Sequence, residues 1–191
     1  MARIRLLNAD PVGDYREACK ITQGIDISME PLKPLKTDMV EWWIKQIIAN
    51  HSTLRSVRFR IIAAAPRSVI MQMIRATKGN PQPEVESSRP DWTGTERSAD
   101  PYELKLYSHD HTAESFRAMA SQRLCNRTEA RTRGYMRDLV AEMAESPEPF
   151  FRALAACCNP PCSMTGYCPE IKGCGQCPRL ADEVIKVYCH G

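Results

Sequence analysis

Apolar residues recur at helical spacing in several parts of the chain. One helix is expected after Asp38 and Glu41, which together resemble an N-terminal capping box. A second begins at Pro66, where a missing N–H is harmless, and ends at Lys78 and Gly79. Further helices are expected at 112–125, 128–145 and 150–156. The apolar positions of the four longer helices are Val40, Trp43, Ile44, Ile47 and Ile48; Val69, Ile70, Met73 and Ile74; Ala113, Phe116, Ala120 and Leu124; and Met136, Leu139, Val140 and Met143.

Two short segments, 3–7 and 57–61, alternate between apolar and arginine side chains, as half-buried strands do. Residues 13–36 mix glycine, proline and short apolar pieces, so we expect them to be irregular. His109 and His111 could suggest a metal site, but two residues at i and i+2 share a face only on a strand. This polar segment precedes a predicted helix, so we expect it to be the entry to that helix.

The helix that begins at Pro66 has a polar face and leads into a long polar loop. Ser68, Gln72 and Arg75 lie on the face that the apolar stripe does not use. The loop, 79–92, has varied donors and acceptors and almost nothing to bury. A loop of this length inside a domain is usually functional or disordered. We therefore predict either a site for a small polar anion or a solvated surface loop.

Short motifs in this region resemble those of the flavin-dependent thymidylate synthases, in particular a divergent branch found in phages and some bacteria. Residues 72–75 supply Gln-x-x-Arg, and Ser87, Ser88 and Arg89 supply the Ser-x-Arg that ends the following loop. Two features depart from the family pattern. The His-Arg pair beside the flavin is replaced by Ala76 and Thr77, and the loop is two residues longer.

The resemblance continues on either side of the loop. His51 and Ser52 match a His-Ser segment, and Arg123 and Arg133 match arginines at the end of one helix and the start of the next. It implies a nucleotide site formed by Gln72, Arg75, Ser87, Arg89 and Arg133, in which Arg89 and Arg133 would be catalytic. It implies flavin contacts from His51, Ser52, Arg75 and Arg123. From the residues alone, His51 also suits a helix C-terminus, and the segment around Arg123 suits a solvated helix hairpin.

The family transfers a one-carbon unit from methylenetetrahydrofolate to C5 of dUMP, with FAD supplying hydride and NADPH regenerating it. The resemblance therefore implies this reaction, on dUMP or a related pyrimidine deoxynucleotide. It also implies an α+β fold, in which a sheet packs against several helices, and a homotetramer with sites between subunits. The corresponding nucleotide- and flavin-binding domain would be residues 1–156, followed by a cysteine-rich tail, residues 157–191.

Composition sets broad limits on the protein's class. The chain has 191 residues, of which 43% are hydrophobic, enough for the core of one domain. A net charge of +3 is too weak to argue for nucleic acid. No apolar run is long enough for a membrane-spanning helix, and the N-terminus lacks a signal-peptide pattern, so we expect a cytoplasmic protein.

Five of the nine cysteines lie between Cys158 and Cys177, among several glycines and prolines. Such a segment cannot build an apolar core, but thiolate ligation of zinc or an iron–sulfur cluster would fold it. The candidate ligands are Cys158, Cys162, Cys168, Cys174 and Cys177. Their spacing is not that of a standard zinc ribbon or ferredoxin, so the choice of four stays open. In the divergent branch the matching positions are Cys158, Cys162, Cys168 and Cys174.

Two other functions are compatible with these features. Loss of the His-Arg pair suggests a degenerate relative that binds a nucleotide without redox chemistry. The arginines and the cysteine-rich tail suggest instead a metal-stapled module that binds nucleic acid. The weak net charge and the lack of a series of aromatic residues for base stacking make nucleic acid the less favoured partner.

Overall fold

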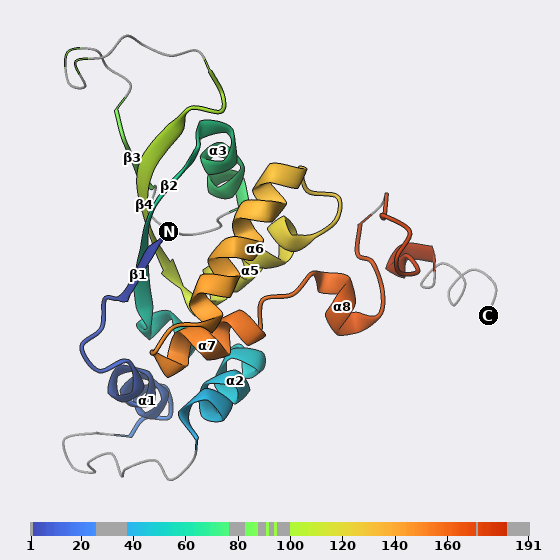
Figure 1. The fold of residues 1–191 in the computed structure, drawn as a ribbon. Helices are drawn as coiled ribbons and strands as arrows, with labels where there is room; N and C mark the ends of the chain where they lie inside the picture. The colour runs from blue at the N-terminus through green and yellow to red at the C-terminus, as the bar shows by residue number, and fades with distance from the viewer. Residues whose placement is uncertain are drawn as a thin grey trace.

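The computed structural model describes residues 2–25, 38–76, 83–87, 91, 94, 100–170 and 172–182. The fold is α+β, with a four-stranded antiparallel sheet in the order β1-β2-β4-β3 and several helices on one of its faces (Figure 1). The elements are β1 (Arg3–Leu6), α1 (Pro11–Thr22), α2 (Met39–Ala49), the 3-10 helix η1 (Ser52–Ser56), β2 (Arg58–Pro66), α3 (Arg67–Ala76), β3 (Glu84–Val85), β4 (Leu104–Thr112), α5 (Ala113–Leu124), α6 (Ala130–Ala144), α7 (Pro149–Ala156) and α8 (Pro161–Thr165).

The sheet is built on the pairing of β2 with β4, which runs from Arg58 opposite Thr112 to Pro66 opposite Leu104. The expectation of a polar helix entry around His109 and His111 was wrong, because both residues belong to strand β4. The strand has an inverted pattern: its polar side chains face the helices and its leucines face outward. A search for apolar residues at every second position on a buried face misses a strand with this pattern.

Two other elements differ from expectation. The expectation that residues 13–36 are irregular was wrong for the first part of that range, because Pro11–Thr22 forms helix α1. Its N-cap Asp10 accepts a hydrogen bond from the backbone N–H of Gly13, and its first residue is Pro11. Residues 26–37 lie outside the described residues. Strand β2 extends beyond Ile61 through three alanines to Pro66, so α3 begins one residue later than expected. Alanine has low strand propensity, and the pairing with β4 overrides that preference.

Helices α2, α5, α6 and α7 confirm the sequence pattern, whereas the short helix α8 was not predicted. Asp38 caps α2 by accepting hydrogen bonds from the backbone N–H groups of Val40 and Glu41. Thr112 and Ser115 form a reciprocal capping box at the start of α5. Strand β4 therefore passes directly into α5 without a loop. None of the helices in the described ranges is long and apolar enough to cross a bilayer.

The core lies between the sheet and the helices, and Phe59 of β2 is at its centre. The Phe59 ring is fully buried and lies within 6.0 Å, centroid to centroid, of the rings of His111, Phe116, Phe150 and Phe151. These rings come from β4, α5 and α7, so one side chain ties three elements to β2. Edge-to-face aromatic pairs of this kind add to the stabilisation from burial.

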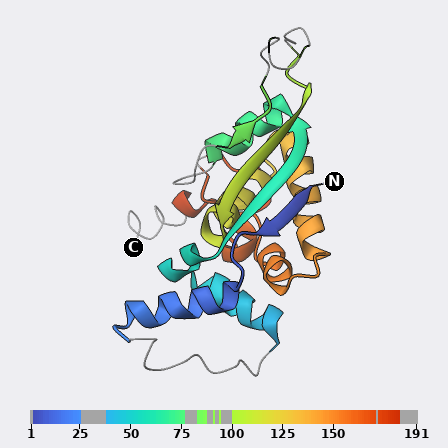
Figure 2. The ribbon, with the colours of Figure 1, turned by 90° about the vertical axis from the view of Figure 1, so that its left-hand side faces the viewer.

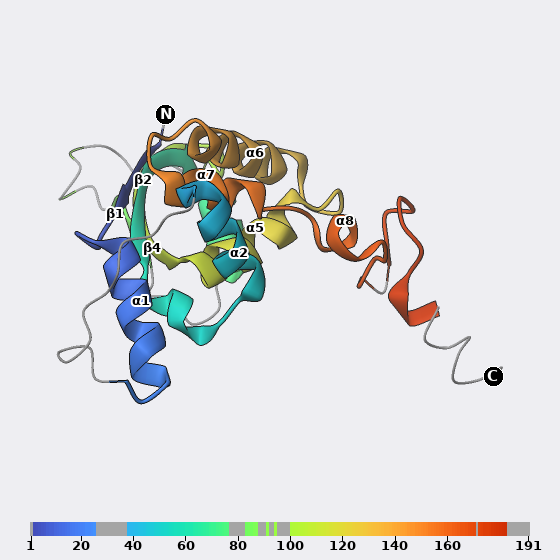
Figure 3. The same ribbon diagram turned by 90° about the horizontal axis from the view of Figure 1, so that it is seen from below.

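In the part of the chain that the structure describes, no helix packs on the other face of the sheet, and Figure 2 shows β1, β2 and β4 in front of the helices. Leu104 and Leu106 are 64% and 54% exposed on this face. Arg60 and Asp110 form a bidentate ion pair there, across the β2–β4 ladder. Beyond α7, the chain leaves the core and extends through α8 toward the C-terminus, away from the sheet (Figure 3).

The position of Phe59 predicts a large loss of stability when its ring is removed. Phe59→Ala should lower the free energy of unfolding by about 3–5 kcal/mol, because it removes contacts with three elements and leaves a cavity. Leu106→Ala, on the exposed face of the neighbouring strand, should change it by less than about 0.5 kcal/mol. Urea unfolding followed by circular dichroism measures both. Equal losses in the two variants would contradict this description of the core.

Candidate functional site

Helices α3 and α5 meet at their C-terminal ends, where three of the expected site residues lie together. Helix α3 follows β2 at one end of the β2–β4 ladder, and α5 follows β4 at the other end, then packs against α3. The Arg123 guanidinium, in the last turn of α5, donates a hydrogen bond to the backbone oxygen of Gln72 in α3. Arg75 lies on the next turn of α3, three residues after Gln72.

The two guanidinium groups of this cluster repel each other. Burial, followed by the nearby positive charge of Arg75, lowers the pKa of Arg123. Arginine nevertheless stays protonated at neutral pH. The Nε atom of Arg123 is buried without a hydrogen-bond partner in the described structure. Within the same ranges neither guanidinium forms an ion pair. We call Gln72, Arg75 and Arg123 the arginine cluster.

Arg133, predicted to contact the nucleotide, is placed differently. It lies in the first turn of α6, and its guanidinium donates to the backbone oxygens of Asn126 and Thr128 at 2.9 and 3.2 Å. It therefore holds the loop between α5 and α6, and the structure does not bring its guanidinium to the arginine cluster.

The loop residues of the predicted nucleotide site are only partly described. Ser87 follows β3 and is half-buried, whereas Arg89 lies outside the described residues. Ala76, at the position of the family's histidine, is buried in the core and is 4% exposed. It therefore offers no group to a cofactor, and its neighbour Thr77 lies outside the described residues.

His51 and Ser52 are both exposed, at the start of η1. Arg55 of η1 pairs with Glu114 at 2.8 Å, so η1 lies beside the first turn of α5. Arg123 is nine residues further along α5, about 13 Å at 1.5 Å per residue. The four predicted flavin contacts therefore divide into two sets at opposite ends of α5. Within one chain, these four residues are too far apart for a single flavin ring to contact all of them.

Strand β4 places a line of polar side chains on the helix-covered face, which the sequence analysis missed. Lys105, Tyr107, His109 and His111 are all at most 5% exposed. The Lys105 ammonium lies 2.9 Å from a carboxylate oxygen of Glu103. The Tyr107 hydroxyl lies 2.7 Å from that of Tyr135 in α6. The period-two spacing in residues 104–112 was the available signal for this strand.

Burial controls the ionisation of these groups. It is the main cause that raises the pKa of Tyr107 far above its usual value, so the phenol stays protonated and able to donate. Burial, followed by the charge of His109, lowers the pKa of His111 well below its usual value. The His109 and His111 rings are 4.1 Å apart, so two positive charges there would repel each other.

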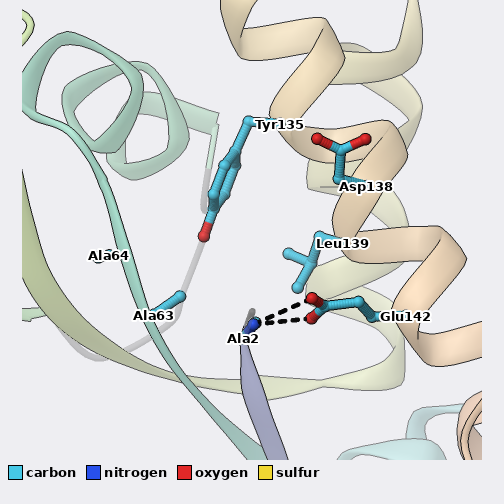
Figure 4. Close-up of a pocket in the computed structure, with 7 residues that line it drawn as sticks. All are labelled: Ala2, Ala63, Ala64, Tyr135, Asp138, Leu139 and Glu142. Atoms are coloured by element: carbon cyan, nitrogen blue, oxygen red, sulfur yellow. Dashed lines mark hydrogen bonds between the residues drawn. The ribbon is translucent and has the colours of Figure 1, made fainter.

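A cavity of about 420 Å³ lies between β2 and α6, as Figure 4 shows. Its polar lining residues are Tyr135, Asp138 and Glu142, so two of the three are acidic. Glu142 also accepts a hydrogen bond from the Ala2 backbone nitrogen at 2.9 Å. Two carboxylates make this cavity unsuitable for a phosphate, in contrast to the arginine cluster.

The cysteines fall into two environments. Cys158 is 5% exposed, belongs to the hydrophobic core next to Cys157, and has its pKa raised to about 12, chiefly by burial. Burial, followed by the neighbouring Cys177 thiol, raises the pKa of Cys162. Cys174 is exposed. In the described ranges, no group of three or more His, Cys, Asp and Glu side chains is arranged as a metal site.

No protein-family model matches this chain, and no curated protein matches it in sequence.

The depressed pKa of His111 predicts how stability depends on pH. The folded state keeps His111 neutral, whereas in the unfolded chain it takes up a proton near pH 6.5. Its contribution to stability is therefore complete above about pH 6.5. As the pH falls below this value, the free energy of unfolding should decrease by up to about 1.4 kcal/mol per pH unit.

Urea unfolding at pH 7.5, 6.5 and 5.5 measures this slope. His111→Phe should flatten it, because a phenyl ring keeps the aromatic packing and cannot ionise. The matched control is His51→Gln, which removes an exposed histidine and should leave the slope as in the wild type. A wild-type slope in His111→Phe would show that other groups cause the pH dependence.

Proposed function

We propose that this chain binds a pyrimidine deoxynucleotide at the arginine cluster and transfers a one-carbon unit to C5 of its base, as flavin-dependent thymidylate synthases do. The observation that carries the proposal is the approach of Arg75 and Arg123 without an acidic partner among the described residues. The positive charge of Arg75 acts unfavourably on that of Arg123, and an anion bound between them would remove this repulsion. A phosphate would neutralise both groups and accept hydrogen bonds from both.

Gln72 supports a nucleotide over a simple anion such as sulfate. Its backbone oxygen already accepts a hydrogen bond from Arg123, so the main chain of α3 is held against α5 at this point. Its side-chain amide carries both a donor and an acceptor, as the edge of a pyrimidine base does. One residue can therefore position the base while the adjacent arginines hold the phosphate. Ser87, Arg89 and Arg133 stay predictions for this site.

The transfer requires methylenetetrahydrofolate as donor and FAD, reduced by NADPH, to supply hydride. Because His51 and Ser52 lie at the other end of α5 from Arg123, a flavin contacted by both sets would need residues of two chains. This supports the proposal of a homotetramer with sites between subunits. The role of the arginine cluster is to hold the nucleotide and offset negative charge that develops on its base.

A second candidate function is nucleotide binding without redox chemistry. It is favoured by Ala76, which is buried where the family has a flavin-contacting histidine. The two candidates share the nucleotide site and differ in the flavin. Purified protein titrated with FAD separates them, because a bound flavin gives a yellow protein with a characteristic absorbance.

The first test of the proposal is calorimetric titration with dUMP, dCMP and dGMP. A pyrimidine nucleotide should bind, and Arg75→Ala or Arg123→Met should weaken its binding by roughly tenfold to a hundredfold. This range follows from about 1.5–3 kcal/mol for each charge-assisted contact. Arg5→Ala is the matched control, since it removes an exposed arginine from β1 and should bind as the wild type does. Failure of any pyrimidine nucleotide to bind would overturn the proposal.

The free energy of unfolding of the Arg123→Met variant separates a binding role of Arg123 from a structural one. Arg123→Met removes a half-buried charge that is repelled by Arg75 and whose Nε has no partner among the described residues. It should therefore lower the free energy of unfolding by at most about 1 kcal/mol, the net contribution of one hydrogen bond. A loss of several kcal/mol would make Arg123 a structural residue.

The division of the flavin contacts also predicts an oligomer. Light scattering at micromolar concentration should give a mass of about four chains, as the family resemblance implies. A monomer at this concentration would rule out a flavin site formed by two chains. It would leave the nucleotide site of the single chain standing.

A further inference from the structure

The face of the sheet that no described helix covers carries its charges in an ordered pattern (Figure 2). Every second residue of a strand points to this face, and the strand register sets which of these residues lie side by side. Arg60 of β2, for example, lies opposite Asp110 of β4. We call this surface, formed by the odd-numbered residues of β1 and the even-numbered residues of β2, β3 and β4, the open face.

The edge of the open face at β1 and β2 is positively charged. Arg3 and Arg5 of β1 are exposed there, and Arg58 and Arg60 follow on β2. Arg60 forms a bidentate ion pair with Asp110. Within the described ranges Arg3, Arg5 and Arg58 form no ion pair. This edge therefore presents positive charges that the described residues of one chain leave unpaired.

The opposite edge of the open face, at β3, is acidic. Glu84 accepts a hydrogen bond from the Ser108 hydroxyl at 3.0 Å, and Glu86 accepts one from the Leu106 backbone N–H at 2.9 Å. Both glutamates are exposed. The register places Arg3 and Glu84 in one row across the sheet, three strand spacings or about 14 Å apart. They are therefore too far apart to pair within one chain.

The middle of the open face is apolar toward the end of the ladder where α3 begins. Ala64 of β2 lies opposite Leu106 of β4, and Leu104 follows on the same strand. Both leucines are more than half exposed. The described residues of the open face include no aromatic side chain on which a nucleic-acid base could stack. An apolar centre between charged edges is typical of a surface that binds protein.

We propose that the open face packs on the open face of a second copy of this chain, about a two-fold axis that is parallel to the strands and lies between β2 and β4. Such an axis places β1 over the partner's β3 and β2 over the partner's β4, and keeps each residue at its position along the strands. Arg3 then faces the partner's Glu84, and Arg60 faces the partner's Asp110. A two-fold axis across the strands would set arginine against arginine, which is unfavourable.

The size of the open face suits an interface of this kind. Two sheets that pack face to face lie about 10 Å apart, with their strands within about 30° of each other. The β2–β4 ladder is nine residues long, about 30 Å. Two open faces of this length and about 15–20 Å wide bury about 1,000 Å² in total, the lower end of the range for specific interfaces. Charge pairing therefore has to supply much of the specificity.

This interface does not rest on the proposed nucleotide site, because the arginine cluster belongs to α3 and α5 on the other side of the sheet. In the proposed homotetramer it would be one of the two-fold contacts. Nucleotide binding should be unchanged in variants of the open face, so a failure of the interface and a failure of the nucleotide site can be told apart.

The test is charge reversal at the two edges of the open face, with the mass of the full-length protein measured by light scattering. Arg3→Glu and Glu84→Arg, each alone, set like charges against each other twice across the interface, so each variant should have half the mass of the wild-type assembly. An equal mixture of the two variants should recover the wild-type mass, because both pairs in the mixed dimer again have opposite charges. This recovery cannot arise within one chain.

Two control variants should keep the wild-type mass. Arg137→Glu makes the same charge change at an exposed position of α6, away from the sheet. Leu106→Ala keeps the open face apolar and leaves all its charges in place. Circular dichroism of each variant checks that the fold is retained.

Three results would overturn the proposal. They are a wild type that stays monomeric at the highest concentration at which it dissolves, edge variants that keep the wild-type mass, and a mixture that stays dissociated. Titration with a labelled single-stranded oligonucleotide covers the other occupant of an arginine-rich surface. Binding by a monomeric wild type that is lost in Arg3→Glu would assign the open face to nucleic acid instead.

Discussion

The pairing of β2 with β4 is the constraint on which the rest of the structure depends. The two strands pair along nine residues, from Arg58 opposite Thr112 to Pro66 opposite Leu104. Helix α3 continues directly from one strand and α5 from the other, at opposite ends of the ladder. The approach of Arg123 to Gln72 therefore follows from the register. A slip of one residue would move Phe59 and His111 to the exposed face and displace both helices.

This pairing also explains why polar groups are buried. With Phe59, Ile61, Ala63 and Ala65 of β2 facing the helices, the opposite residues of β4 must face them too. Those residues are Lys105, Tyr107, His109 and His111. Each polar group buried in this way has to be satisfied, and the Glu103 carboxylate and the Tyr135 hydroxyl do this for Lys105 and Tyr107. The buried face is thus partly polar, which favours one register over its alternatives.

The chain consists of a part built on a hydrophobic core and a C-terminal segment without such a core. Residues up to Cys158 share one hydrophobic core, in which aromatic rings join the sheet to the helices. Among the described residues after Cys158, only Cys168 is buried, so this segment has no such core. A thiolate-bound metal stays a sequence-based prediction for this segment. The proposed nucleotide site and the open face both lie within the first part.

The sequence by itself determined the elements whose buried side is apolar. Helices α2, α3, α5, α6 and α7 were predicted from their stripes and caps, because local spacing dictates which face is buried. Strand β4 and the end of β2 were decided only by tertiary structure, since the residues that pair between them lie 38 to 54 positions apart in the sequence. Gln72 and Arg75 could be selected from one helix face. Arg123 joins them, whereas His51 and Ser52 do not. Both facts depend on contacts between distant segments, which spacing along the chain does not encode.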